Sequence, residues 1–92
     1  MKNIRVSFYH DPGHGWYRIS IKDLRALGIA DQISACSAVH GASVYLEEDD
    51  DASLLGSALK DRGIIAKVHR CKQESRSRVR SYRSYRSSVV KL

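Results

Sequence analysis

The stretch from Tyr45 to Ile64 constrains the fold of this chain more than any other part of the sequence. It contains, in order, the end of a strand, five consecutive acids, a short amphipathic pattern and a glycine. Carboxylates at the start of a helix accept free backbone N–H groups and complement the positive end of the helix dipole. We therefore expect a helix that begins at Asp49, Asp50 and Asp51, stops at Gly63 and buries Leu54, Leu55, Ala58 and Leu59.

Two segments near the N-terminus are predicted to form a hairpin. Apolar and polar residues alternate from Ile4 to Tyr9 and again from Trp16 to Ile21, which is the period of a half-buried strand. Asp11-Pro12-Gly13 lies between them, and proline followed by glycine favours a turn.

A short helix and three further strands are predicted beyond this hairpin. Ser20-Ile21-Lys22-Asp23 has the spacing of a capping box, which predicts a helix over residues 21–27. Apolar residues at a spacing of two predict strands over 32–39, 43–48 and 64–68, the first two of them forming a second hairpin.

These elements occur in the order β-β-α-β-β-α-β. A chain of 92 residues is long enough for one hydrophobic core but too short for two. Alternating strands of this kind form a sheet with one buried side and one side facing solvent. We therefore predict a single α+β domain over residues 1–72, with a mostly antiparallel sheet and two short helices on one face.

Residues 73–92 are predicted to form a basic tail. Up to Val68 the chain has eight Lys/Arg against nine Asp/Glu, a net charge of −1, whereas from His69 onward it has eight against one, a net charge of +7. No apolar periodicity supports packing, so we expect a mobile segment or one that binding orders. Its cationic and aromatic residues are Arg76, Arg78, Arg80, Tyr82, Arg83, Tyr85 and Arg86.

This composition suits a polyanionic partner. Guanidinium groups pair with phosphates, and tyrosine rings can stack on unpaired bases. Two alternatives stay open. The tail could have a structural role by docking on acids of this chain or of a neighbouring copy, or it could be solvated without any partner.

The predicted hairpin tip is the second candidate site. His10, Asp11 and His14 could contribute to a metal site or to a His–Asp pair that moves protons, but the spacing supplies no third ligand. Trp16 and Tyr17 could instead form a contact surface, because rigid aromatic residues are good anchors. A purely structural turn is the alternative that we expect most.

The acid run offers a third candidate, an acidic surface made of Glu47, Glu48, Asp49 and Asp50. It could contact a partner or imitate the charge of phosphates, whereas its spacing lacks the alternating oxygens and central glycine of an EF-hand. We expect the acid run to be simply the N-terminus of a helix with excess negative charge.

Cys36 is expected to be a buried thiol without a catalytic role.

Four segments of the chain resemble a family of small proteins encoded by bacteriophages and other mobile elements. They are F-Y-H-D-P-G-H-G-W (8–16), L-G-I-A-D-Q-I-S (27–34), V-Y-L-E-E-D-D-D-A (44–52) and S-R-V-R-S-Y (77–82). The resemblance implies a protein of the bacterial host cytoplasm and transfers no catalytic residue. Small accessory proteins of such elements often bind host machinery, defence systems included, which is an argument by analogy.

Together these patterns predict a non-enzymatic accessory protein without a cofactor or a bound metal. The first hypothesis is that it binds and inhibits or modulates a host protein or ribonucleoprotein complex that handles nucleic acid or defends the cell. The alternative is direct DNA or RNA binding through the basic tail. No apolar run approaches the roughly 18–20 residues of a membrane span, so we expect no membrane partner. An exposed edge strand would allow a homodimer.

Overall fold

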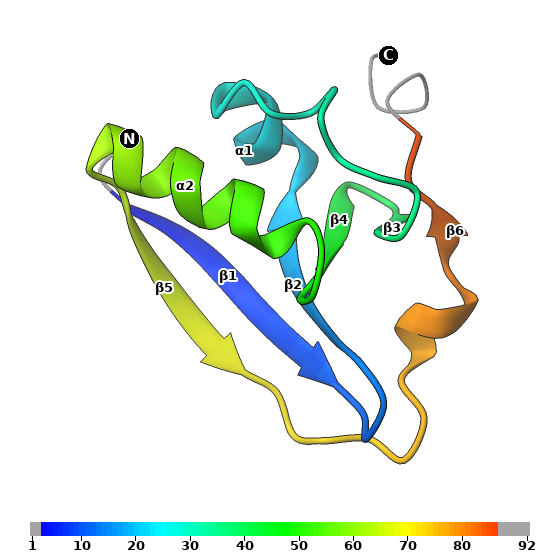
Figure 1. Cartoon of the computed structure of the whole chain (residues 1–92). Coiled ribbons are helices and arrows are strands. Elements are labelled where there is room, and N and C mark those ends of the chain that lie inside the picture. The colour runs from blue at the N-terminus through cyan, green and yellow to red at the C-terminus, as the bar shows by residue number, and fades with distance from the viewer. Residues whose placement is uncertain (1–2, 87–92) are drawn as a thin grey trace.

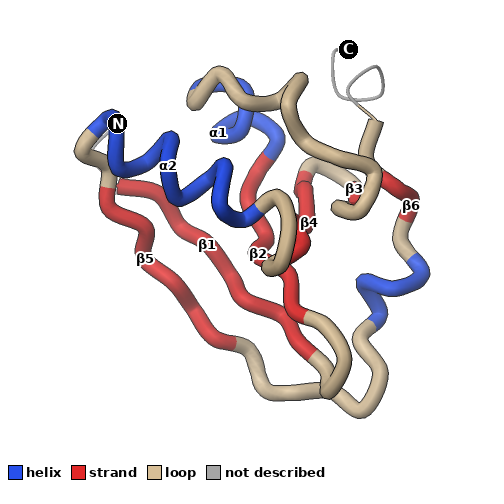
Figure 2. The backbone as a smooth tube through the Cα atoms, viewed as in Figure 1, coloured by secondary structure: helices blue, strands red, loops and turns tan. Residues whose placement is uncertain are grey.

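The computed structural model describes residues 3–86 of the chain. In that range one six-stranded sheet has the strand order β5-β1-β2-β4-β3-β6 (Figures 1 and 2). The strands are β1 (Asn3–His10), β2 (Gly15–Ser20), β3 (Ala38–His40), β4 (Ser43–Glu47), β5 (Ile65–Arg70) and β6 (Arg83–Ser84). The helices are α1 (Ile21–Ala26), α2 (Ala52–Arg62) and a 3₁₀ helix, η1 (Arg78–Ser81).

The predicted α+β class and the mostly antiparallel sheet are confirmed. Neighbouring strands are antiparallel except for β5, which runs parallel to β1. Parallel strands need a long connection between them, and here the chain reaches β5 through α2.

Both predicted helices form, and they lie on the same face of the sheet (Figure 1). The Ser20 side chain accepts a 3.0 Å hydrogen bond from the Asp23 backbone N–H and so caps α1. Gly63 ends α2 in the left-handed conformation, with φ at 64°. Between the helices and the sheet lies the main core, which includes Ile4, Val6, Ile19, Leu24, Leu27, Val44, Leu46, Leu55, Ala58 and Leu59.

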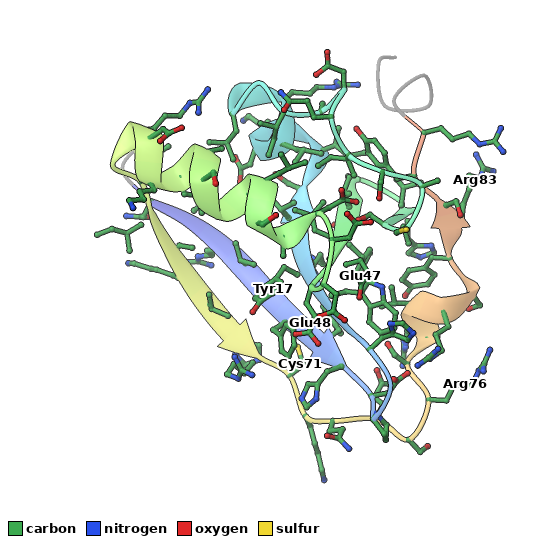
Figure 3. All side chains as sticks on the ribbon, viewed as in Figure 1. Tyr17, Glu47, Glu48, Cys71, Arg76 and Arg83 are labelled. Carbon is green, nitrogen blue, oxygen red and sulfur yellow. The ribbon has the colours of Figure 1, made fainter. Side chains whose placement is uncertain are left out.

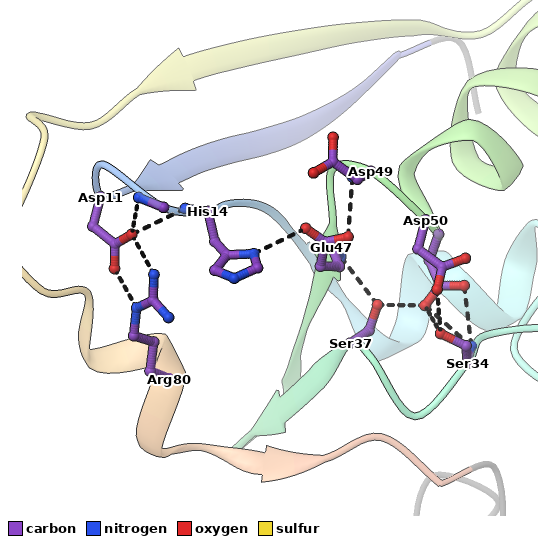
Figure 4. A network of polar contacts seen from close by, with 10 residues as sticks. Asp11, His14, Ser34, Ser37, Glu47, Asp49, Asp50 and Arg80 are labelled. Atoms are coloured by element: carbon purple, nitrogen blue, oxygen red, sulfur yellow. Dashed lines mark hydrogen bonds and ion pairs between the residues drawn. The ribbon is translucent and has the colours of Figure 1, made fainter.

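The predicted strand over 32–39 is mostly wrong, because only Ala38–His40 pairs with its neighbours. The loop before β3 is held instead by Asp51, whose carboxylate accepts hydrogen bonds from the Ser34 backbone N–H and from the hydroxyls of Ser34 and Ser37 (Figure 4). These backbone and hydroxyl groups need acceptors once they are withdrawn from water, and the sheet does not provide them. Asp51 is consequently the N-cap residue of α2 without capping it through its side chain, contrary to our expectation.

The prediction of a mobile tail is wrong for the segment from Ser77 to Arg86. Val79 and Tyr85 are buried, and β6 extends the sheet by pairing with β3. Two isolated anchors six positions apart produce no apolar periodicity, which explains why the sequence pattern missed them. A boundary at residue 72 therefore divides what is one fold, while residues 87–92 of the predicted tail lie outside the described residues.

Two smaller observations complete the fold. Cys36 is exposed, not buried as we expected, because it lies in the loop before β3 and not within a strand. Among residues 3–86 no helix combines the length and the apolar character that crossing a membrane requires.

Candidate nucleic-acid interface

The sheet face opposite the helices is here called the open face. Strand registers show which side chains share it, since directly paired residues point to the same side of a sheet. Arg5 of β1 pairs with Lys67 of β5, while Ser7 pairs with both Arg18 of β2 and His69 of β5. The cations Arg5, Arg18 and Lys67 therefore gather on three adjacent strands together with the His69 imidazole, and we call these four residues the cationic patch.

The cationic patch surrounds an open depression of about 620 Å³. All four of its side chains belong to exposed residues, and Asp23 is the only carboxylate that lines the depression. Within residues 3–86 Arg80 forms an ion pair with Asp11 and the His14 imidazole lies 3.5 Å from the Glu47 carboxylate, whereas no residue of the patch has a carboxylate that close. Unpaired charges concentrated in this way create a local positive potential that attracts anions.

An aromatic row continues from the patch across the open face. It consists of Tyr9, Tyr45, Tyr82 and His40, whose consecutive ring centroids lie 5.6, 5.1 and 4.2 Å apart. The last pair, His40 and Tyr82, is stacked with only 9° between the ring planes. Arg18 joins the row to the patch through a long hydrogen bond of 3.4 Å from its Nη1 to the Tyr9 hydroxyl.

Tyr45 is the most enclosed member of the aromatic row. Burial raises the pKa of its phenol above the ordinary value, and the neighbouring Tyr82 and Tyr9 add to that effect. The hydroxyl therefore stays neutral in the whole physiological range. The neutral Tyr45 ring thus fills the middle of the row, beneath its more exposed neighbours Tyr9 and Tyr82.

The C-terminal arginines lie in three different settings. Arg78 borders a depression with Tyr9, Tyr45 and Tyr82, which Glu74 also lines. Arg83 borders another with His40 and Tyr82, so Arg78 adds charge along the aromatic row and Arg83 adds it at the far end. Arg76 and Arg83 project outward from the same side of the molecule (Figure 3). Arg86 is also exposed, at the end of the described residues.

Arg80 is the exception, because it is committed to the fold. Its Nε and Nη2 donate to the two carboxylate oxygens of Asp11 at 2.6 and 2.7 Å, which is a bidentate pair. Asp11 also accepts from the backbone N–H groups of Gly13, His14 and Ser77. Figure 4 shows its contacts with His14 and Arg80. Arg80 in first place, then Ser77, hold the pKa of Asp11 far below its ordinary value. The hairpin tip is thus a structural clamp that fastens the C-terminal segment.

Three aromatic residues that the sequence suggested as binding residues do not lie on the binding surface. They are Trp16, Tyr17 and Tyr85. Trp16 is only 5% exposed, because it packs with Ala38, Tyr45 and Val79. Tyr17 points to the helix side of the sheet and contacts Phe8 with ring centroids 4.7 Å apart, so Trp16 and Tyr17 form no common contact surface. Tyr85 is 1% exposed and cannot stack on a ligand.

The acid run is divided between the interior and the surface. Glu47 is buried, and its carboxylate accepts a 3.0 Å hydrogen bond from the Asp49 backbone N–H while the other oxygen lies 3.5 Å from His14. Glu48, Asp49 and Asp50 are exposed near the start of α2. Among residues 3–86 no three His, Cys, Asp or Glu side chains come together as metal ligands.

Comparison with known proteins finds no matching family model, no similar curated protein and no similar solved structure. The assignment of a function therefore rests on the open face itself. Sequence reasoning missed the cationic patch, although one signal was present. Arg5, Arg18 and Lys67 all occupy the polar positions of alternating strands, and strand pairing then adds their charges together.

Proposed function

We propose that this chain is a non-enzymatic protein that binds nucleic acid through the open face of its sheet. The observation that carries the proposal is the cationic patch, in which Arg5, Arg18 and Lys67 lie on adjacent strands without a close carboxylate partner. Lysine and arginine side chains that neutralise phosphates supply most of the affinity of proteins for nucleic acid.

Arg78, beside the aromatic row, and Arg83, at its far end, support the proposal. With them the charge follows a path from β5 to the C-terminal segment and does not form an isolated spot. An elongated array of cations suits a chain of phosphates better than a single small anion. The C-terminal arginines would thus contact phosphates, as the sequence suggested. They would do so from a folded surface and not as part of a flexible arm.

The first test compares binding of labelled oligonucleotides by the wild type and by the double variant Arg18→Ala/Lys67→Ala over a range of salt concentrations. We expect the double variant to bind roughly tenfold or more weakly, because two phosphate contacts are lost. The slope of log K against log salt should also become shallower by about 1.4, on the basis of about 0.7 per contact for a single strand.

The control for this experiment is Arg25→Ala/Lys60→Ala, which removes one arginine and one lysine from α1 and α2. These two residues are exposed on the helices, which cover the other face of the sheet. The control has the same net charge as the double variant, so it should retain nearly all of the affinity. Equal losses in both variants, or no binding by the wild type near physiological salt, would contradict the proposal.

A protein partner is the second candidate function, and the edge of the sheet at β5 is the observation that favours it. Within residues 3–86 β5 is an edge strand of the sheet, and its Ile65 and Val68 are 67% and 46% exposed. An extended segment of another protein could add to such an edge. In the setting of a phage or mobile element, that partner would be a host complex that the chain inhibits or modulates.

A homodimer through β5 is disfavoured by charge. It would bring the Lys67 and Arg70 side chains of two copies together, and cationic edge residues oppose self-pairing. The variant Ile65→Lys/Val68→Lys tests whether the β5 edge binds a host protein. Loss of a defined host partner in a pull-down, with oligonucleotide binding intact, would establish the edge as a protein-binding site, whereas an unchanged set of partners would rule it out.

A further inference from the structure

We infer that the ligand of the open face is single-stranded nucleic acid, with unpaired bases stacked on the His40–Tyr82 pair. This inference rests on the proposed function and specifies its substrate class. Its basis is the combination of a stacked ring pair with exposed arginine and lysine side chains on one sheet face. The cationic patch alone would not distinguish a single strand from a duplex, whereas the rings can stack only on unpaired bases.

The His40–Tyr82 pair has the geometry of a stacking platform. The two rings are nearly parallel and 4.2 Å apart, His40 is exposed, and Tyr82 is half-buried. They line an open depression of about 550 Å³ together with Arg83 and Gly41. A base that enters this depression would find a flat ring and a guanidinium group side by side, and each base stacked on an aromatic side chain adds affinity without requiring a particular sequence.

The platform is rigid because it is supported from below. Tyr82 packs against the cluster of Trp16, Ala38, Tyr45 and Val79, and its backbone N–H donates a 3.1 Å hydrogen bond to the Val79 carbonyl at the end of η1. His40 ends β3, where it pairs with Ser43 of β4. A ring that is already held in place loses little conformational entropy when a base stacks on it.

The distances along the open face fit a short single strand. Four strand-to-strand steps separate β3, which carries His40, from β5, which carries Lys67. At about 4.8 Å per step the platform and the far side of the cationic patch are about 19 Å apart. That length is sufficient for several nucleotides, with phosphates on the patch and on Arg83 and bases over the accessible rings of His40, Tyr82 and Tyr9.

A duplex would use this surface less well. Its bases are stacked on one another and paired, so the faces of the rings at His40 and Tyr82 would have no base to contact. Only its phosphates could reach the cationic residues, and the aromatic row would then contribute nothing. The inference therefore predicts a preference that depends on the rings and not on the charges.

The decisive experiment measures fluorescence anisotropy with a labelled oligothymidylate of about 20 nucleotides and with a duplex of equal length, a size that covers common single-strand site sizes. Wild type, His40→Ala and His40→Phe are compared with the cationic double variant. We expect His40→Ala to lose roughly five- to 150-fold in affinity for the single strand and little for the duplex. His40→Phe keeps a ring without ionisable nitrogen and should restore binding.

The outcomes separate this inference from the proposed function. If the cationic double variant weakens binding while His40→Ala has the same small effect on single strand and duplex, the platform is wrong and the proposed function stands. If the wild type prefers the duplex, the substrate class is overturned in the same way. If neither the wild type nor any variant binds either oligonucleotide, the proposed function fails and the inference fails with it.

Discussion

Tyr85→Ala is expected to lower the free energy of unfolding by about 3–5 kcal/mol, the range for deleting a buried aromatic ring. Tyr85 is 1% exposed and belongs to the main core between the sheet and the helices. Its hydroxyl donates a hydrogen bond to the Ala30 carbonyl, and its backbone N–H donates to the Ser37 carbonyl at 2.8 Å. Urea denaturation followed by circular dichroism at neutral pH would measure the loss.

Two further variants make the Tyr85 prediction specific. Tyr85→Phe keeps the ring and removes only the hydroxyl, so it should cost about 1–3 kcal/mol, because the Ala30 carbonyl loses its donor. Arg86→Ala changes the adjacent exposed residue and should stay within about 0.5 kcal/mol of the wild type. Equal stability of Tyr85→Ala and Arg86→Ala would show that the segment does not pack as described.

Asp11→Asn should detach the C-terminal segment from the hairpin tip and destabilise the protein at neutral pH. The amide keeps the shape of the carboxylate but removes its charge. It also places an NH₂ group at one of the two oxygen positions, where either Gly13, His14 and Arg80 or Ser77 and Arg80 require an acceptor. Arg80 also lies 5.7 Å from the Trp16 ring, so loosening should be visible as a red shift of tryptophan fluorescence.

The effect of Asp11→Asn should depend on pH in a defined direction. Because the pKa of Asp11 is depressed in the folded protein, its contribution to stability is complete above the ordinary aspartate value of 3.8 and is lost as the pH falls below it. The difference in urea midpoint between wild type and variant should therefore be largest near pH 7 and shrink below about pH 4. Asp61→Asn, at an exposed position of α2, is the matched control. A difference that stays constant down to pH 3 would exclude the ion pair as its cause.

Some elements of this fold could be predicted from patterns of neighbouring residues alone. The capping pattern at Ser20, the apolar spacing from Leu54 to Leu59 and the glycine at residue 63 each specify a structure through neighbouring residues alone. The first hairpin and the end of α2 were therefore predictable within one or two residues. Residues 32–39 show the limit of that reasoning, because Ser34 and Ser37 bond to Asp51, a residue more than ten positions away.

The candidate site was less predictable than the fold. Arg78, Tyr82 and Arg83 were named from the sequence and do border the aromatic row, whereas Arg80, Tyr85 and Trp16 were named and are committed to the interior or to an ion pair. A repeated S-Y-R motif gives Tyr82 and Tyr85 the same local sequence. Only the packing of the chain assigns one to the surface and the other to the core.

The sequence alone determined the α+β class, the two helices and the first hairpin, since capping, periodicity and turn residues act over a few positions. The tertiary structure decided that the C-terminal segment through Arg86 belongs to the fold and that Arg5, Arg18, Lys67 and His69 form one patch. Strand pairing and a bidentate ion pair 69 positions apart bring these residues together. Such contacts arise from the register of the sheet and the burial of a few anchors, and no local spacing in the sequence encodes either of them.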